Sequence, residues 1–132
     1  MNWATKYIGL PFLLGGRSRE GLDCWGLVQL VYQEELNESL PVFPGIAEEN
    51  VLSHSRDIAR ESELMWKELP HPDDLCAVAM GQGPVLHHVG VWASGDGGKI
   101  IHAWKDLHVI ADTLRTIKLK GFTTIKYYGL RE

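Results

Sequence analysis

The sequence has few cysteines, no long apolar run and little excess charge. Only two cysteines, Cys24 and Cys76, occur in 132 residues. Two are too few for a secreted disulfide scaffold, so we expect both to be free thiols. No apolar run approaches the roughly 20 residues that cross a bilayer, so we expect no membrane insertion. The formal net charge of −4 gives no electrostatic reason to expect nucleic acid as a partner.

The N-terminus also lacks the features of an export signal. Residues 1–7 contain no long apolar segment and no small-residue cleavage site. We therefore expect a chain that is made without a signal peptide or has already lost one. The length predicts a single domain over residues 1–132, large enough to bury a core without metals or disulfides.

Helical signals dominate the first half of the chain and strand signals the second. Apolar residues recur at helical spacing over residues 23–37, and shorter signals predict helices at residues 2–7 and 47–62. Short apolar runs bounded by turn residues predict strands at residues 75–80, 88–93, 99–104, 107–111 and 123–128. The pattern predicts an α+β fold with N-terminal helices packed on an antiparallel β-sheet.

Cys24 lies at the predicted start of the helix over residues 23–37. Asp23 can cap this helix, and the backbone N–H groups and positive dipole end there would stabilise a thiolate. Gly26 would leave open space beside the sulfur for a substrate backbone. The alternative is a buried structural cysteine on an amphipathic helix. Cys76 lies inside an apolar strand run, and we expect it to be inert.

Six histidines are available as a base for a thiolate nucleophile, which needs a base held by a third group. His54 and His71 lie among polar and proline residues, and we expect them at the surface. His88 and His102 lie on strands that flank a predicted hairpin turn, so pairing would bring them to the same end. His87 would point to the opposite strand face. Each could instead be an ordinary hydrogen-bonded strand residue.

The pair of histidines allows two kinds of chemistry. His88 or His102 could accept the proton of Cys24 while the other orients its ring, or the three residues could bind zinc. No Cys-x-x-Cys or His-x-x-x-His pair is present to anchor a metal by local spacing. We therefore expect neither a metal nor another cofactor.

Three blocks of the sequence resemble, in order and spacing, the NlpC-type cell-wall peptidases, which are papain-like cysteine peptidases of bacteria and their phages. The blocks are Asp23-Cys24-Trp25-Gly26, His88-Val89-Gly90-Val91 and Ile101-His102-Ala103. The resemblance implies that Cys24 is the nucleophile, His88 the base and His102 the residue that orients His88. It also implies that the Cys24 backbone N–H helps to form an oxyanion hole.

The resemblance further implies a substrate, the peptide stem of bacterial peptidoglycan, which would be hydrolysed through a thioester. Two residues depart from the family pattern. Phe12 stands where relatives often have a tyrosine, so the contribution of that hydroxyl is absent or comes from elsewhere. Trp25 replaces a commoner serine or alanine and looks more like the phage-tail branch. We therefore expect synthesis in the bacterial cytoplasm, with phage tail-tip proteins as partners.

Two other functions fit the same resemblance. The missing hydroxyl at Phe12 favours a catalytically silent tail or binding component, whereas the complete Cys-His-His set opposes it. A chain with the same chemistry could also be an amidase or acyltransferase acting on a substrate outside the cell wall. A thiol probe tests the first alternative, and digestion of peptidoglycan tests the second.

Overall fold

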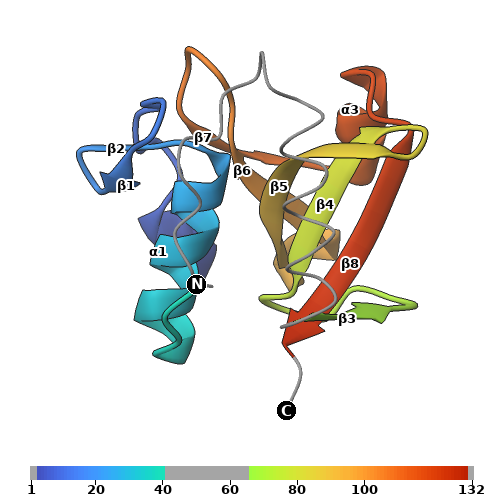
Figure 1. The fold of residues 1–132 in the computed structure, drawn as a ribbon, viewed down its shortest axis with the longest axis horizontal. Helices are drawn as coiled ribbons and strands as arrows, with labels where there is room; N and C mark the ends of the chain where they lie inside the picture. Colours follow the sequence, from blue (N-terminus) through green and yellow to red (C-terminus); the bar gives the residue numbers. More distant parts are fainter. Residues whose placement is uncertain (1–2, 41–65, 131–132) are drawn as a thin grey trace.

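The computed structural model describes residues 3–40 and 66–130 (Figure 1). The first part forms η1 (Trp3–Lys6), β1 (Arg17–Ser18), β2 (Gly21–Leu22) and α1 (Cys24–Leu36). The second part forms β3 (Trp66–Leu69), β4 (Ala77–Gln82), β5 (Val85–Ala93), η3 (Gly95–Gly97), β6 (Lys99–Ala103), β7 (Val109–Asp112), α3 (Leu114–Leu119) and β8 (Thr124–Leu130). The helix expected at residues 47–62, together with His54, lies outside the described residues.

Six strands form one antiparallel sheet in the order β3-β8-β4-β5-β6-β7. Strands β4 to β7 follow one another as a meander, and β8 returns to pair with both β4 and β3. Helix α1 packs against β5, and Figure 1 shows it lying beside the sheet. The predicted α+β fold, with N-terminal helices on an antiparallel sheet, is confirmed.

Helix α1 has the limits that the sequence predicts. It runs from Cys24 to Leu36, with Asp23 as its N-cap and Asn37 as a C-cap in the left-handed conformation. The side-chain carboxylate of Asp23 accepts a hydrogen bond from a backbone N–H of the first turn, which would otherwise lack a helical partner. The cap therefore fixes the point at which the helix, and with it Cys24, begins.

Buried side chains form two clusters that contact opposite faces of the sheet. Because successive strand residues point to opposite faces, neighbours along one strand belong to different clusters. The α1-side cluster includes Leu27, Val28, Val31, Ala77, Ala79, Val89 and Val91. The α3-side cluster includes Cys76, Val78, Met80, Trp92, Ile100, Ile117 and Phe122. Cys24 belongs to the α1-side cluster, so the two thiols lie in separate parts of the core.

Besides the two-residue strands β1 and β2 and the short η3, the sequence-based expectations lack β3 and α3. Strand β3 has only four residues, two of them the exposed Lys67 and Glu68, so it carries no apolar run. Helix α3 has six residues, which is too short for a helical period to stand out. No helix within residues 3–40 or 66–130 is both long and apolar enough to cross a membrane.

Candidate active site

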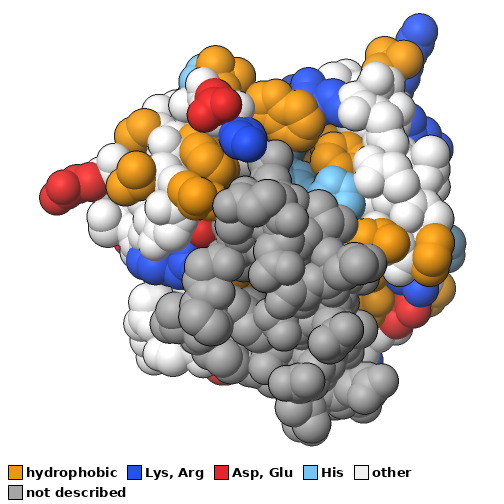
Figure 2. All heavy atoms as spheres, turned by 45° about the horizontal axis from the view of Figure 1, so that its top comes forward, with side chains coloured by type: hydrophobic (Ala, Val, Ile, Leu, Met, Phe, Trp, Pro, Cys, Tyr) orange, Lys and Arg blue, Asp and Glu red, His pale blue; other side chains and the backbone are white. Residues whose placement is uncertain are grey.

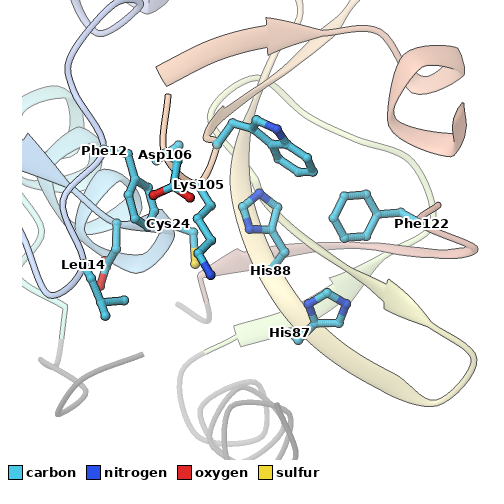
Figure 3. A pocket seen from close by; sticks show the side chains of 11 residues that line it. Phe12, Leu14, Cys24, His87, His88, Lys105, Asp106 and Phe122 are labelled. Atoms are coloured by element: carbon cyan, nitrogen blue, oxygen red, sulfur yellow. The ribbon is translucent and has the colours of Figure 1, made fainter. Parts of the chain in front are cut away.

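A pocket lined by residues of both core clusters contains Cys24 and His88. Cys24 comes from the α1-side cluster, and Phe122, on the opposite wall, belongs to the α3-side cluster. Figure 3 shows Cys24 and His88 entering the pocket from different elements. On the face drawn in Figure 2, histidine side chains are visible in a hollow flanked by hydrophobic side chains. The structure therefore brings the predicted nucleophile and base into one cavity.

Asp23 anchors the loop that precedes Cys24. The residue is 1% exposed, and its carboxylate accepts hydrogen bonds from the Gly26 N–H at 2.8 Å, the Gly15 N–H at 3.0 Å and the Arg17 guanidinium at 2.6 Å. One side chain thus joins the start of α1 to the preceding loop. The capping role predicted for Asp23 is confirmed.

The open space expected beside Gly26 is not present. A Cβ atom added at Gly26 would lie 2.1 Å from the carbonyl oxygen of Gly16 and 3.2 Å from an Arg17 guanidinium nitrogen. The preceding loop therefore occupies the space that the sequence suggested for a substrate backbone. Glycine is needed here because the loop packs directly on the helix, and the expectation of open space for a substrate backbone at Gly26 was wrong.

His88 and His102 form a hydrogen-bonded pair across β5 and β6. The His88 Nε2 and His102 Nδ1 atoms are 2.9 Å apart, and the two rings are nearly perpendicular, with an interplanar angle of 83°. Gly90 leaves room for this contact, because a Cβ atom there would lie 3.1 Å from the His102 Cβ. The predicted proximity of the two histidines is confirmed.

A fourth polar residue, Asp112 on β7, extends the pair. Its Oδ2 atom lies 2.8 Å from the Nε2 atom of His102, whose side chain is fully buried. The sequence-based strand ended one residue earlier, at residue 111, so this carboxylate was not assigned. Pairing of β6 with β7 places Ile110 opposite His102. Residues two apart in a strand share a face, so Asp112 lies on the same face as Ile110, and a predicted strand one residue longer would have included it.

Aromatic side chains hold the ring of His88. Phe122 stacks on it with a centroid distance of 5.5 Å and an interplanar angle of 12°. Trp104 meets it edge to face at 6.0 Å. Because the ring is packed between these neighbours, its two nitrogens have fixed directions: Nε2 toward His102, and the other nitrogen toward Cys24 in Figure 3.

The expected direction of His87 is wrong, because β5 contains a bulge. Met80 pairs with His88, but the next residue, Gly81, pairs with Leu86, so His87 is an extra residue in its strand. Its ring lies 5.6 Å from that of Phe122 and lines the same pocket as His88. The bulge has interrupted the alternation of side chains on which the expectation rested.

Burial keeps both paired histidines neutral. Desolvation is the main cause that lowers the pKa of His88 well below its usual value near 6.5, and the nearby His102 and His87 lower it further. Burial also lowers the pKa of His102, although the Asp112 carboxylate opposes the shift. A neutral His88 retains a lone pair and can accept a proton at neutral pH.

The remaining residues that the sequence analysis singled out differ in their positions. Phe12 lines the pocket, His71 is exposed as expected, and neither cysteine is in a disulfide bond. Burial raises the pKa of Cys76 to about 11. Within the part of the chain that the structure describes, no group of three or more His, Cys, Asp or Glu side chains is arranged to hold a metal ion.

This chain is similar to known proteins over most of its length. The NlpC/P60 family model matches residues 9–126. A probable endopeptidase of Haemophilus influenzae is 34% identical over 98 residues, which are 74% of this chain and 53% of that protein. A gamma-DL-glutamyl hydrolase of Bacillus subtilis is 54% identical over 39 residues, 29% of this chain and 9% of that protein. The chain thus spans about half of the first relative's length and much less of the second's.

Two solved structures share the fold. The crystal structure of the NlpC/p60 domain of the peptidoglycan hydrolase SagA has a TM-score of 0.63 and 19% identity, covering 94% of this chain and 91% of that domain. An NLP/P60 family protein from Staphylococcus aureus, described as similar to lipoprotein, has a TM-score of 0.58 and 20% identity, covering 93% of this chain and 38% of that protein. At these identities the likeness shows a common fold.

Proposed function

The chain belongs to the NlpC/P60 family, and we propose that it is a cysteine peptidase that hydrolyses amide bonds in the peptide stem of bacterial peptidoglycan. One observation carries the proposal: Cys24 begins a helix inside a pocket that it shares with His88, whose ring is hydrogen-bonded to His102. A thiol, a neutral base and a group that orients the base are the parts that thiol-based acyl transfer requires.

The proposed reaction begins with proton transfer from the Cys24 thiol to His88. The sulfur attacks the substrate carbonyl carbon, and the N-terminal end of α1 favours the negative charge that develops beside it. His88 returns the proton to the leaving amine, so that a thioester remains on Cys24. His88 then accepts a proton from water, the hydroxide attacks the thioester, and the carboxylic acid product leaves as the thiol is restored.

The pocket has the mixed character that a short peptide substrate requires. Apolar surface comes from Phe12, Leu14 and Phe122, while Lys105 and Asp106 add one charge of each sign on the β6–β7 turn. Figure 3 shows Lys105 extending into the pocket. A stem peptide carries both carboxylate and amino groups, so paired opposite charges beside apolar walls can orient it. The description of SagA as a peptidoglycan hydrolase supports the same substrate class, and the name of the Haemophilus relative, a probable endopeptidase, supports cleavage within a peptide.

Digestion of purified peptidoglycan tests the proposal. The wild-type chain should release stem-peptide fragments with one new amino and one new carboxyl terminus, identified by mass spectrometry. Cys24→Ala should release none, and the matched variant Cys76→Ala should release as much as wild type. A folded wild-type chain that reacts with a thiol probe but leaves peptidoglycan intact would favour an amidase or acyltransferase with another substrate. Absence of both reactions would favour a catalytically silent component.

We also propose that the enzyme acts as part of a phage tail, made in the bacterial cytoplasm and joined to tail-tip proteins. The support is the sequence pattern around Trp25, a residue that is buried in the α1-side cluster. Antibody labelling of purified phage particles by electron microscopy tests this location. Labelling at the tail tip is expected, and its absence from particles of a phage that encodes the chain would refute the assignment.

A further inference from the structure

We propose that Asp112 is a positioning residue that sets the tautomers of His102 and His88, so that the lone pair of His88 faces Cys24. The inference deepens the proposed function and depends on it for its catalytic meaning. Asp112 lies at the far end of a continuous chain of contacts that runs from the pocket into the sheet. It touches neither the sulfur nor the pocket surface, and it therefore acts through the histidines.

The geometry joins three strands by two short contacts. The His88 Nε2 and His102 Nδ1 atoms are 2.9 Å apart, and the His102 Nε2 and Asp112 Oδ2 atoms are 2.8 Å apart. Both distances are within hydrogen-bond range. His102 is 0% exposed, so water cannot replace either partner. Each ring nitrogen of His102 therefore has one protein partner.

The chemistry of these partners allows only one arrangement of protons. A carboxylate can only accept a hydrogen bond, so the His102 Nε2 atom must carry the proton. Neutral His102 then has its lone pair on Nδ1, and the His88 Nε2 atom must donate to it. Neutral His88 is left with its lone pair on Nδ1, the nitrogen that faces Cys24 in Figure 3. The carboxylate thus determines the proton position at the pocket through two rings.

The same arrangement supports the charged state of the base. When the Cys24 proton moves to His88 Nδ1, the sulfur keeps the electron pair and His88 becomes an imidazolium. Its Nε2–H still donates to His102, and no proton needs to move to Asp112. Burial lowers the pKa of His102 and Asp112 raises it, and burial has the larger effect. The net lowering favours the neutral form of His102 that this arrangement needs.

Lys120 completes the environment of the carboxylate. Its ammonium group lies 3.4 Å from Asp112 Oδ2 and 5.1 Å from the centroid of the Trp104 ring. The nearby charge balances the carboxylate, so the partly buried Asp112 is compensated on one side by Lys120 and on the other by the His102 N–H. Asp112 and Lys120 are thus the charged groups that shift the pKa of His102. Outside the pair, His87 is the titratable group that shifts the pKa of His88.

Nitrogen-15 spectra of the histidine rings in the full chain test the proposal without reference to activity. In the wild type, His88 and His102 should both show the pattern of a neutral ring protonated at Nε2. In Asp112→Asn the amide can donate to His102 Nε2, and the two rings should shift toward the form protonated at Nδ1. The matched control Asp73→Asn, at an exposed aspartate, should leave both patterns unchanged.

Kinetics on peptidoglycan fragments provide the second readout. Asp112→Asn should lower kcat by about 10- to 100-fold with little change in KM, because it alters the state of the base but not the pocket surface. The pH profile of kcat should move as well, which a merely structural defect would not cause. A wild-type spectrum with His102 protonated at Nδ1 would overturn the inference even if every Asp112 variant failed to fold. Correct tautomers in a chain without activity would instead refute the proposed function alone.

Discussion

The two cysteines lie in different clusters of the core, and different polar groups surround their sulfur atoms. Cys24 begins a helix at a pocket that also contains His88. Cys76 lies in the α3-side cluster next to the start of β4, where Asp73 and Asp74 are its charged neighbours. Their exposed fractions are nearly equal, 7% and 4%. Burial alone therefore does not distinguish the two thiols, and the groups around each sulfur do.

The surroundings act in opposite directions on the thiolate. At Cys24 the helix terminus favours negative charge and a neutral histidine is available to accept a proton. At Cys76, burial is the main cause that raises the pKa to about 11, and the carboxylates of Asp73 and Asp74 also raise it. The two thiols therefore differ in the groups around each sulfur: Cys24 has a helix terminus and the pocket that contains His88, whereas Cys76 has the apolar α3-side cluster and two carboxylates.

The largest expected effect comes from removing the base on the Cys24 side. His88→Ala should lower kcat/KM for peptidoglycan fragments by roughly three orders of magnitude, because it removes the ring whose nitrogen faces Cys24 and which the His102 contact holds in place. The control His71→Ala, at an exposed histidine, should remain within about twofold of wild type. Steady-state kinetics make the measurement, and a His88→Ala chain with most of its activity would remove the basis for distinguishing the two thiols.

Thiol labelling tests the comparison directly. At pH 6 a thiol with the pKa of Cys76 is ionised to the extent of about one part in 10⁵. Brief treatment with iodoacetamide should therefore modify Cys24 at least about 100-fold faster than Cys76, as quantified by mass spectrometry of the digested chain. Faster labelling of Cys76 would reverse the assignment of the two sulfurs.

Variants of His102 test whether this residue acts at the Cys24 site as a hydrogen-bond acceptor for His88. A positioning group needs an acceptor for the His88 Nε2–H, and this role does not require a proton in transit. His102→Asn and His102→Gln should keep a sizeable part of the activity, while His102→Ala should lose about 10- to 100-fold in kcat. Equal losses in His102→Asn and His102→Ala would show that the acceptor is not what matters at this position.

The smallest expected effect is on stability in acid, to which the His88 side of the core contributes and the Cys76 side does not. His88 and His102 have lowered pKa values in the folded chain, so their contribution to stability is complete above about pH 6.5 and decreases as the pH falls below it. Each can change the free energy of unfolding by up to about 1.4 kcal/mol per pH unit. Urea unfolding gives the free energy of unfolding at pH 7.5 and at pH 5.5. The loss between these two pH values should be smaller in His88→Gln than in the wild type, and equal to the wild-type loss in Cys76→Ala. An unchanged difference in His88→Gln would contradict the lowered pKa.

The sequence was sufficient for the parts of the site that depend on local pattern. The cap at Asp23 and the helical spacing behind it predict where α1 begins, because both signals lie within a few residues. The hairpin between β5 and β6 predicts that His88 and His102 come together. These features require only the regular geometry of a helix and of an antiparallel pair.

The remaining features depend on contacts between distant residues or on irregular backbone. The Gly16 carbonyl fills the space beside Gly26 because the loop folds back on the helix, and no spacing rule predicts this. The bulge that redirects His87 breaks the period of two on which strand predictions depend. Asp112 joins the site only through the pairing of β6 with β7, which sets its register against His102.

The site residues come from two parts of the fold, the histidines and Asp112 from the β-meander and Cys24 from helix α1, and this division affects the order of folding. The contacts from His88 to His102 and from His102 to Asp112 span only 14 and 10 residues of chain. Cys24 comes from the other half of the sequence and meets His88 only when α1 docks on β5. Contacts close in sequence form faster than distant ones, so we expect the histidine pair to assemble before the thiol arrives. A partly folded chain would then carry a base without a nucleophile, and hydrolytic activity would begin only with the last long-range step.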